Sequence, residues 1–150
     1  MFPFWAALLA NLAAQLLKPL FTYLKTDKFD MLQSIECGGF PSSHSSTVVG
    51  LTMAVLFVEG HESTLFAITA IFSLIVIYDA VNVRYYAGKN IELTKQLISD
   101  IEILNKTKFN GPIYQEKMKA VLGHKYIEVL GGIIVGITTT IFLYFIAFGF

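Results

Sequence analysis

The sequence predicts an all-α, polytopic membrane protein with about four transmembrane helices in a single domain, and three observations carry this prediction. Hydrophobic residues make up 55% of the 150-residue chain and charged residues only 15%, whereas soluble domains carry about 25% charged residues. Mean hydropathy is +0.62. All eleven Lys and Arg residues lie in segments 18–28 and 84–125, and four long apolar runs fill most of the remaining chain.

The apolar runs place the expected spans in order along the chain. They cover residues 4–23, 43–58, 63–83 and 127–148. Three of them meet the roughly 20 apolar residues that a full crossing requires. The second is shorter, unless the preceding Gly-Gly-Phe-Pro stretch at 38–41 also enters the membrane. Bare backbone is too costly in lipid, so such a stretch must line a shielded or wet cavity, and a recessed pocket is expected where the second span begins.

The segment of about 89–125, between the third and fourth spans, is expected to be an amphipathic helical loop. Its apolar positions recur at three- and four-residue steps, which is a helical pattern. These positions are Ile91, Thr94, Leu97, Ile98, Ile101 and Leu104. A break at 110–112 separates a second short helix. Both helices are expected to lie on the membrane surface or to cap the bundle, although a partner-binding face is an equal alternative for the second.

The distribution of Lys and Arg predicts the orientation, because short cytoplasmic loops are enriched in these residues. The turn 59–62 holds two acids and neither Lys nor Arg, so this turn and both termini are expected outside the cytoplasm. The basic segments then face the cytoplasm, in what is expected to be a bacterial cytoplasmic membrane. No positive charge precedes the first apolar run, which is therefore interpreted as a retained helix. The single cysteine, Cys37, excludes an intramolecular disulfide.

Four crossings would bring the polar groups together at the basic end of the bundle, where a site is expected. One group opens the second span and reads Gly38-Gly39-Phe40-Pro41-Ser42-Ser43-His44-Ser45. A helix N-terminus favours an anion through its free N–H groups and its dipole. The two glycines would let backbone approach a ligand, and His44 would add a titratable proton donor. A plain helix cap explains the serines equally well.

A second group lies at the start of the last span and at the ends of two others. His124 and Glu128 are four residues apart, so on a helix both point the same way. A carboxylate that holds one imidazole nitrogen leaves the other free to attack; the alternative is a buried structural pair. Lys18 and Arg84 suit phosphate oxygens, although snorkelling to the interface also explains them. Lys18 has apolar neighbours on both sides in an apolar stretch and is expected to lie deeper than simple anchoring requires. Asp79 is expected to pair with one of these cations, because a lone carboxylate there would be costly.

These residues resemble the type 2 phosphatidic acid phosphatase and vanadium haloperoxidase superfamily, and more closely its small divergent bacterial and plastid branch. The resemblance covers nearly the whole chain and rests on three stretches in the same order. They are residues 38–45, Asp79-Ala80-Val81-Asn82-Val83-Arg84-Tyr85-Tyr86-Ala87-Gly88 and Leu122-Gly123-His124-Lys125-Tyr126-Ile127-Glu128-Val129.

The resemblance implies a phosphohistidine mechanism. His124 would attack phosphorus while Glu128 orients it, His44 would protonate the leaving alcohol, and water would then hydrolyse the intermediate. The implied phosphate-binding residues are Lys18, Ser42, Ser43 and Arg84, with Asp79, Gly38, Gly39 and Ser45 in support. No metal or other cofactor is expected, because cations and a helix N-terminus carry the charge that develops on the phosphoryl oxygens.

The chain departs from the superfamily pattern at several positions. Ser43 stands where the motif has Gly, and Glu128 stands where it has Asp. Arg84 precedes His124 by forty residues instead of a few. The first motif is reduced to Lys18 and the proline after it. Four spans are also fewer than the six of typical membrane members.

The expected function is hydrolysis of a phosphate monoester or diphosphate of a lipid that enters from the lipid side. One alternative is a metal-dependent phosphotransferase that uses Asp79, Glu128 and the two histidines His44 and His124. A non-catalytic protein that binds or transports phospholipid headgroups would keep Lys18 and Arg84 without needing His124. A scaffold with a structural polar cluster is the third. The expected partners are the lipid phosphate and the bilayer, and no nucleic acid; a thin wall of four short helices is compatible with a homodimer.

Overall fold

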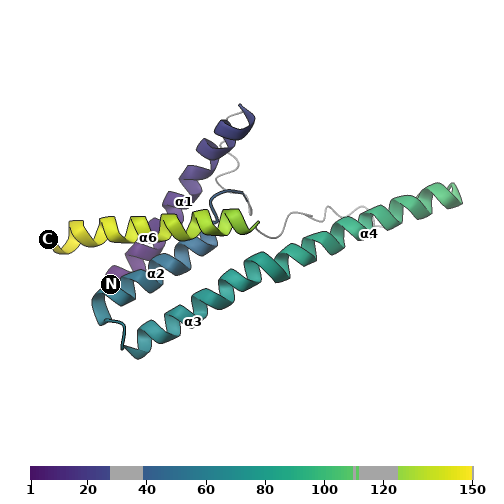
Figure 1. The fold of residues 1–150 in the computed structure, drawn as a ribbon. Coiled ribbons are helices and arrows are strands. Elements are labelled where there is room, and N and C mark those ends of the chain that lie inside the picture. Colours follow the sequence, from purple (N-terminus) through teal and green to yellow (C-terminus); the bar gives the residue numbers. More distant parts are fainter. Residues whose placement is uncertain (28–38, 110, 112–124, 150) are drawn as a thin grey trace.

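All regular structure is helical in this computed structural model, which describes residues 1–27, 39–109, 111 and 125–149 (Figure 1). The elements are α1 (Phe2–Thr26), α2 (Ser43–Glu59), α3 (Thr64–Tyr78), the π-helical segment η2 (Asp79–Val83), α4 (Arg84–Asn105) and α6 (Tyr126–Phe148). The all-α prediction is confirmed, and the helices coincide with the four apolar runs. Both chain ends and the turn between α2 and α3 lie towards the same end of the molecule (Figure 1).

Within the residues that the structure describes, three helical stretches are long and apolar enough to cross a membrane. They are Phe2–Leu24, Thr64–Asn105 and Tyr126–Phe148. By contrast, α2 has 17 residues, so it extends about 25 Å and is shorter than the roughly 30 Å hydrocarbon core. It packs against α1, α3 and α6. Because neighbouring helices surround it, α2 can begin below the membrane surface without exposing its first turn to lipid.

Small residues set the antiparallel packing of α1 on α2. The Ser46 hydroxyl donates to the main-chain oxygen of Ala10 at 2.8 Å. One turn further along α2, a Cβ added to Gly50 would lie 2.9 Å from the Ala10 Cβ and 3.5 Å from the Ala6 oxygen. Later residues of α2 therefore contact earlier residues of α1, so the two helices are antiparallel. The close approach brings polar main-chain groups of α1 within reach of α2 hydroxyls.

A second seam of small residues joins α2 to α6, and these two helices run in the same direction. A Cβ added to Gly132 would lie 2.2 Å from the Ser42 main-chain oxygen, and one added to Gly136 would lie 2.7 Å from the Ser46 oxygen. One turn later, the buried Thr140 hydroxyl donates to the Gly136 oxygen at 2.8 Å. Four-residue spacing of small residues is the pattern that lets membrane helices approach closely.

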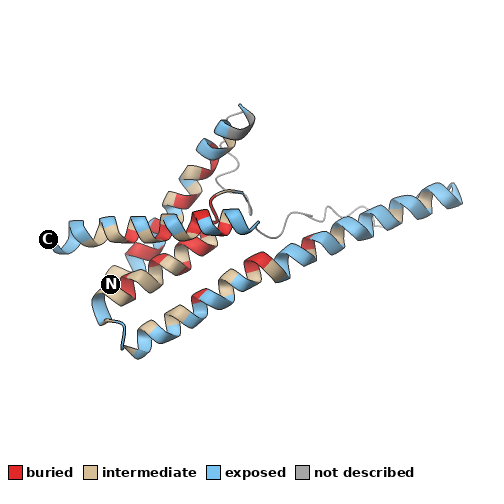
Figure 2. Ribbon diagram, viewed as in Figure 1, coloured by how far each residue is buried: buried red, intermediate tan, exposed pale blue. Residues whose placement is uncertain are grey.

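The buried residues gather where α1, α2 and α6 meet (Figure 2). On the other side of α2, the hydroxyls of Thr52 and Ser73 lie 2.7 Å apart and tie α3 to it. The remaining faces of α3 are apolar and open, as at Ile71 and Leu74, which are 58% and 62% exposed. Such a surface is the one expected of a helix that faces lipid.

The chain after α3 was predicted to form an amphipathic helix that lies on the membrane surface or caps the bundle. The predicted amphipathic helix lies within α4, but α4 continues α3 through η2 and projects away from the bundle (Figure 1). Most of its residues are exposed, and its principal contacts are with η2. The stretch 64–105 contains no proline that would end the helix, so the helix continues from α3 through η2 into α4. The predicted second short helix lies outside the described residues.

Candidate functional site

The start of α2 is built from buried serines with different tasks. Ser42 is the N-cap and is completely buried. Its Oγ accepts the Ser45 N–H at 3.3 Å and the Ser45 hydroxyl at 3.0 Å. Ser43 is 3% exposed, and its hydroxyl makes no hydrogen bond within the described part of the chain. The cap explanation therefore fits Ser42 and Ser45, whereas the Ser43 hydroxyl is available to a ligand.

The N-terminus of α6 lies beside that of α2. The Ser42 N–H donates to the main-chain oxygen of Glu128 at 2.9 Å. The carboxylate of the half-buried Glu128 caps its own helix, because Oε2 accepts the N–H of Lys125 at 3.2 Å. Each helix start carries a partial positive charge and unpaired N–H groups. The start of α2 is buried and that of α6 is exposed at residues 125–127. Two such ends side by side favour a negatively charged group near them, and the Glu128 carboxylate supplies one at α6.

Lys18 carries a full positive charge on the part of α1 that the helix register places just beyond the start of α2. The hydrogen bond from Ser46 to Ala10 fixes the antiparallel register of α1 and α2. Two turns further along α1, Lys18 comes just beyond Ser42 at the start of α2. Its side chain is nearly fully buried, at 2% exposure, so the prediction that it lies deeper than a simple interfacial anchor agrees with its position. A charged side chain this deeply buried among membrane helices is costly unless it is paired, and such positions commonly mark a functional site.

The other residues predicted around the serines are only partly placed. His44 lies in the first turn of α2 and is half-buried, and its Nδ1 is inaccessible to solvent. Gly39 has a φ of +86°, a conformation that favours glycine and turns the chain into α2. Gly38 and His124 lie outside the described residues. The predicted pairing of His124 with Glu128 therefore stays a prediction.

Asp79 and Arg84 form an ion pair at the junction of η2 and α4. Arg84 Nε lies 2.6 Å from Asp79 Oδ2, and the two side chains are 48% and 34% exposed. The prediction that Asp79 pairs with Lys18 or Arg84 is confirmed, and the partner is Arg84. Among the described residues Asp79 is the polar partner of Arg84, and none of the hydrogen bonds or ion pairs found there links it to the serines of α2. A π-turn often marks a functional position in a helix, and η2 also contacts α6.

Two polar residues of α1 that the sequence analysis did not single out share a face with Lys18. Asn11 Nδ2 donates to the Thr47 hydroxyl at 2.7 Å, which donates to the main-chain oxygen of Ser43 at 2.7 Å. Gln15 Oε1 is buried and has no hydrogen-bond partner in the described part of the chain. The spacing of residues 11, 15 and 18 within an apolar helix was the available signal.

The residues that could hold a metal are not gathered in the part of the chain that the structure describes. There, no group of three or more His, Cys, Asp or Glu side chains lies close enough to bind one ion. The metal-dependent alternative required Asp79, Glu128 and both histidines, of which His124 is not described. The chemistry that the described residues support is anion binding by Lys18, the Ser43 hydroxyl and two helix ends.

Comparisons with known proteins identify the family to which the chain is related. Residues 1–139 match the family described as the Divergent PAP2 family. The chain is similar to the uncharacterized membrane protein YuiD of Bacillus subtilis strain 168, with 35% identity over 147 residues, which cover 95% of this chain and 93% of that protein. No solved structure matches the chain.

Proposed function

The chain belongs to the Divergent PAP2 family, and we propose that it is a membrane-embedded phosphatase that hydrolyses a phosphate monoester or diphosphate of a lipid. The observation that carries this proposal is the meeting of the α2 and α6 N-termini at the hydrogen bond from Ser42 to Glu128. The buried Lys18 supports it, because the α1–α2 register places this residue just beyond the start of α2. Lys18, the Ser43 hydroxyl and the free N–H groups would all contact phosphoryl oxygens. Phosphoryl transfer depends mainly on such positioning and charge stabilisation.

The nucleophile in this proposal is His124, which the family resemblance supplies. It precedes Glu128 by four residues, and Glu128 is held against the start of α2. An imidazole nitrogen of His124 would form a bond to phosphorus while the bond from phosphorus to the lipid oxygen breaks. His44 would give its proton to that oxygen, which leaves as the alcohol. Water would then attack the phosphohistidine, releasing phosphate and restoring the free imidazole.

Arg84 has a less direct place in the proposal. The described structure pairs it with Asp79 at 2.6 Å, on a helix whose π-turn contacts α6. In the proposed enzyme, Arg84 would still contact the phosphate, which would approach it from the side of the bundle where α6 lies. Because Lys18 is buried at the helix ends and Arg84 is about half-exposed, the loss of Lys18 is expected to reduce activity more.

The proposal is tested by comparing two lysine substitutions in protein reconstituted into lipid nanodiscs. Lys18→Met keeps the length of the side chain and suits its burial, but removes the charge. Phosphate release from phosphatidic acid and farnesyl phosphate is expected to fall by about 100- to 1,000-fold, the usual loss when one group that stabilises transition-state charge is removed. The matched control is Lys89→Met, because Lys89 is exposed and pairs with Glu92 at 2.7 Å on α4.

The control is expected to retain parental activity within about twofold, because exposed ion pairs contribute little. Equal activity of Lys18→Met and the parent would contradict the proposal, as would equal losses in both variants. Elution as a monodisperse peak in size-exclusion chromatography confirms that each variant is folded before its activity is compared.

A further inference from the structure

A pocket of about 510 Å³ opens between the C-terminal half of α1 and the first turn of α6. Its lining residues are Phe21, Leu24, Phe40, Lys125, Ile127 and Glu128. Four of the six are apolar, and both charged residues belong to the start of α6. The volume lies in the range of pockets that hold small organic ligands, which are mostly apolar with a few placed polar groups.

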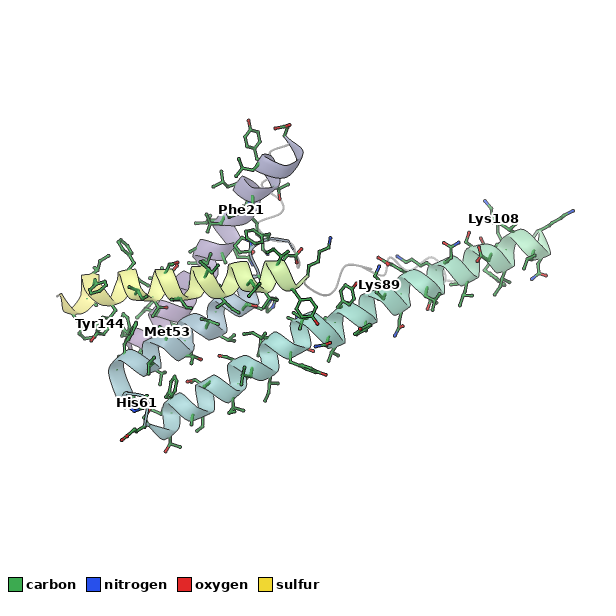
Figure 3. The ribbon with its side chains drawn as sticks, viewed as in Figure 1. Phe21, Met53, His61, Lys89, Lys108 and Tyr144 are labelled. Carbon is green, nitrogen blue, oxygen red and sulfur yellow. The ribbon has the colours of Figure 1, made fainter. Side chains whose placement is uncertain are left out.

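Two aromatic rings shape this pocket. The rings of Phe21 and Phe40 meet edge to face, with centroids 4.6 Å apart and an interplanar angle of 77°. Phe40 also lies against α6, where a Cβ added to Gly131 would be 2.4 Å from its ring. The absence of a side chain at Gly131 therefore makes room for Phe40. Figure 3 shows Phe21 on α1, where that helix passes α6.

The pocket adjoins the anion site. Phe40 stands two residues before Ser42 in the chain. Glu128 is one of the residues that line the pocket, and its main-chain oxygen accepts the Ser42 N–H at 2.9 Å. On the outer side, Leu24 and Ile127 are 70% and 61% exposed. The pocket thus connects an apolar outer surface with the two helix ends.

We propose that this pocket receives the hydrocarbon part of the lipid phosphate, and that the lipid enters from the bilayer between α1 and α6. This inference rests on the proposed function in one respect: the phosphate must bind at the two helix ends. It does not require that the phosphate is hydrolysed. The carbons nearest the phosphate would pack on Phe21 and Phe40. A water-soluble ester would place hydroxyl groups against the same two rings, which offer them no hydrogen bonds in place of water. Hydrogen-bonding side chains enter the lining only at Lys125 and Glu128, so the site favours lipid phosphates.

Tryptophan quenching by brominated lipids tests occupancy without requiring catalysis. The chain has one tryptophan, Trp5, which Trp5→Phe removes. In that background, Ile127→Trp places a probe in the pocket lining, and Ile134→Trp places a control on the exposed face of α6, where Ile134 is 62% exposed. Each protein is placed in nanodiscs that contain the same small fraction of either brominated phosphatidic acid or brominated phosphatidylcholine.

Occupancy predicts stronger quenching at position 127 by phosphatidic acid than by phosphatidylcholine, and equal quenching by the two lipids at position 134. Equal quenching by the two lipids at position 127 would overturn the inference, and if phosphate release persists, the proposed function would still stand. Preferential quenching in a protein that releases no phosphate would support the pocket and refute the phosphatase instead.

A kinetic comparison tests selectivity in the same system. Phe21→Ala removes one ring from the pocket, whereas Leu16→Ala changes a side chain on α1 that is 70% exposed and does not line it. Phe21→Ala is expected to lower kcat/KM for phosphatidic acid by at least about tenfold, the scale of a lost contact in an apolar pocket. Its kcat/KM for glycerol 3-phosphate is expected to stay within about twofold of that of Leu16→Ala. An equal loss on both substrates would overturn the selectivity.

Discussion

Replacing Gly132 by alanine perturbs the contact that positions the candidate site. A Cβ there would lie 2.2 Å from the Ser42 main-chain oxygen and 3.0 Å from the Ser45 Cβ, whereas ordinary contact begins at 3.4 Å. The nearest atom belongs to backbone and cannot rotate away, so α6 and α2 must separate by about 1.2 Å to restore that contact. The 2.9 Å hydrogen bond from the Ser42 N–H to Glu128 spans the same gap.

The energetic and catalytic effects of this substitution differ in size. Overpacking a close contact costs about 1–3 kcal/mol, and alanine recovers about 1 kcal/mol relative to glycine inside a helix. The net loss of stability is therefore at most about 2 kcal/mol. A displacement of about 1 Å between groups that act on one substrate can lower the rate by about 100-fold. Gly132→Ala is thus expected to fold and to lose most of its activity.

The assay pairs thermal stability with phosphate release in nanodiscs for the parent, Gly132→Ala and Ile134→Ala. The last is a control on the same helix, because Ile134 is 62% exposed. Stability is followed by size-exclusion chromatography after heating. The reasoning predicts a small shift in the melting temperature and a large loss of release for Gly132→Ala alone. Parental activity in Gly132→Ala would refute the claim that this contact positions the site.

Two further predictions concern the serines and the topology. Ser42→Ala is expected to lower stability by about 0.5–2 kcal/mol, because it removes the cap of α2. Ser43→Ala is expected to keep parental thermal stability but to lower phosphate release by at least about 100-fold; the reverse pattern would contradict the division of tasks between them. For the topology, His61 and Lys108 lie at opposite ends of the molecule (Figure 3). In a Cys37→Ser background, an impermeant maleimide is expected to label His61→Cys in intact cells and Lys108→Cys only after permeabilisation, and labelling of both in intact cells would refute the orientation.

The sequence predicted those features that depend on local composition. Apolar runs indicated the helices, because burial in lipid requires length and hydropathy that can be counted along the chain. Lys18 was expected to lie deep because Leu17 and Pro19 flank it in an apolar stretch, and it is 2% exposed. Ser42 was expected at a helix start, and it is the N-cap of α2.

Features that depend on pairing between distant segments could not be predicted in this way. The register that sets Gly132 on Ser42 joins positions ninety residues apart, and the polarity of a single residue carries no information about its partner. The sequence left two possible partners for Asp79, Lys18 and Arg84. In the structure the π-helical turn of η2 brings Asp79 to Arg84. The amphipathic pattern of α4 fits a helix on a membrane surface as well as one that extends α3. Only the tertiary structure separates these arrangements.

We propose that this member of the Divergent PAP2 family hydrolyses lipid phosphates through His124. The most direct measurement is phosphate release from a panel of lipid phosphates by the purified protein and by His124→Ala, with binding of each lipid recorded in parallel. The account predicts release by the parent, loss of release in the variant, and lipid binding by both. Binding without release by the parent, or equal release by both proteins, would contradict it.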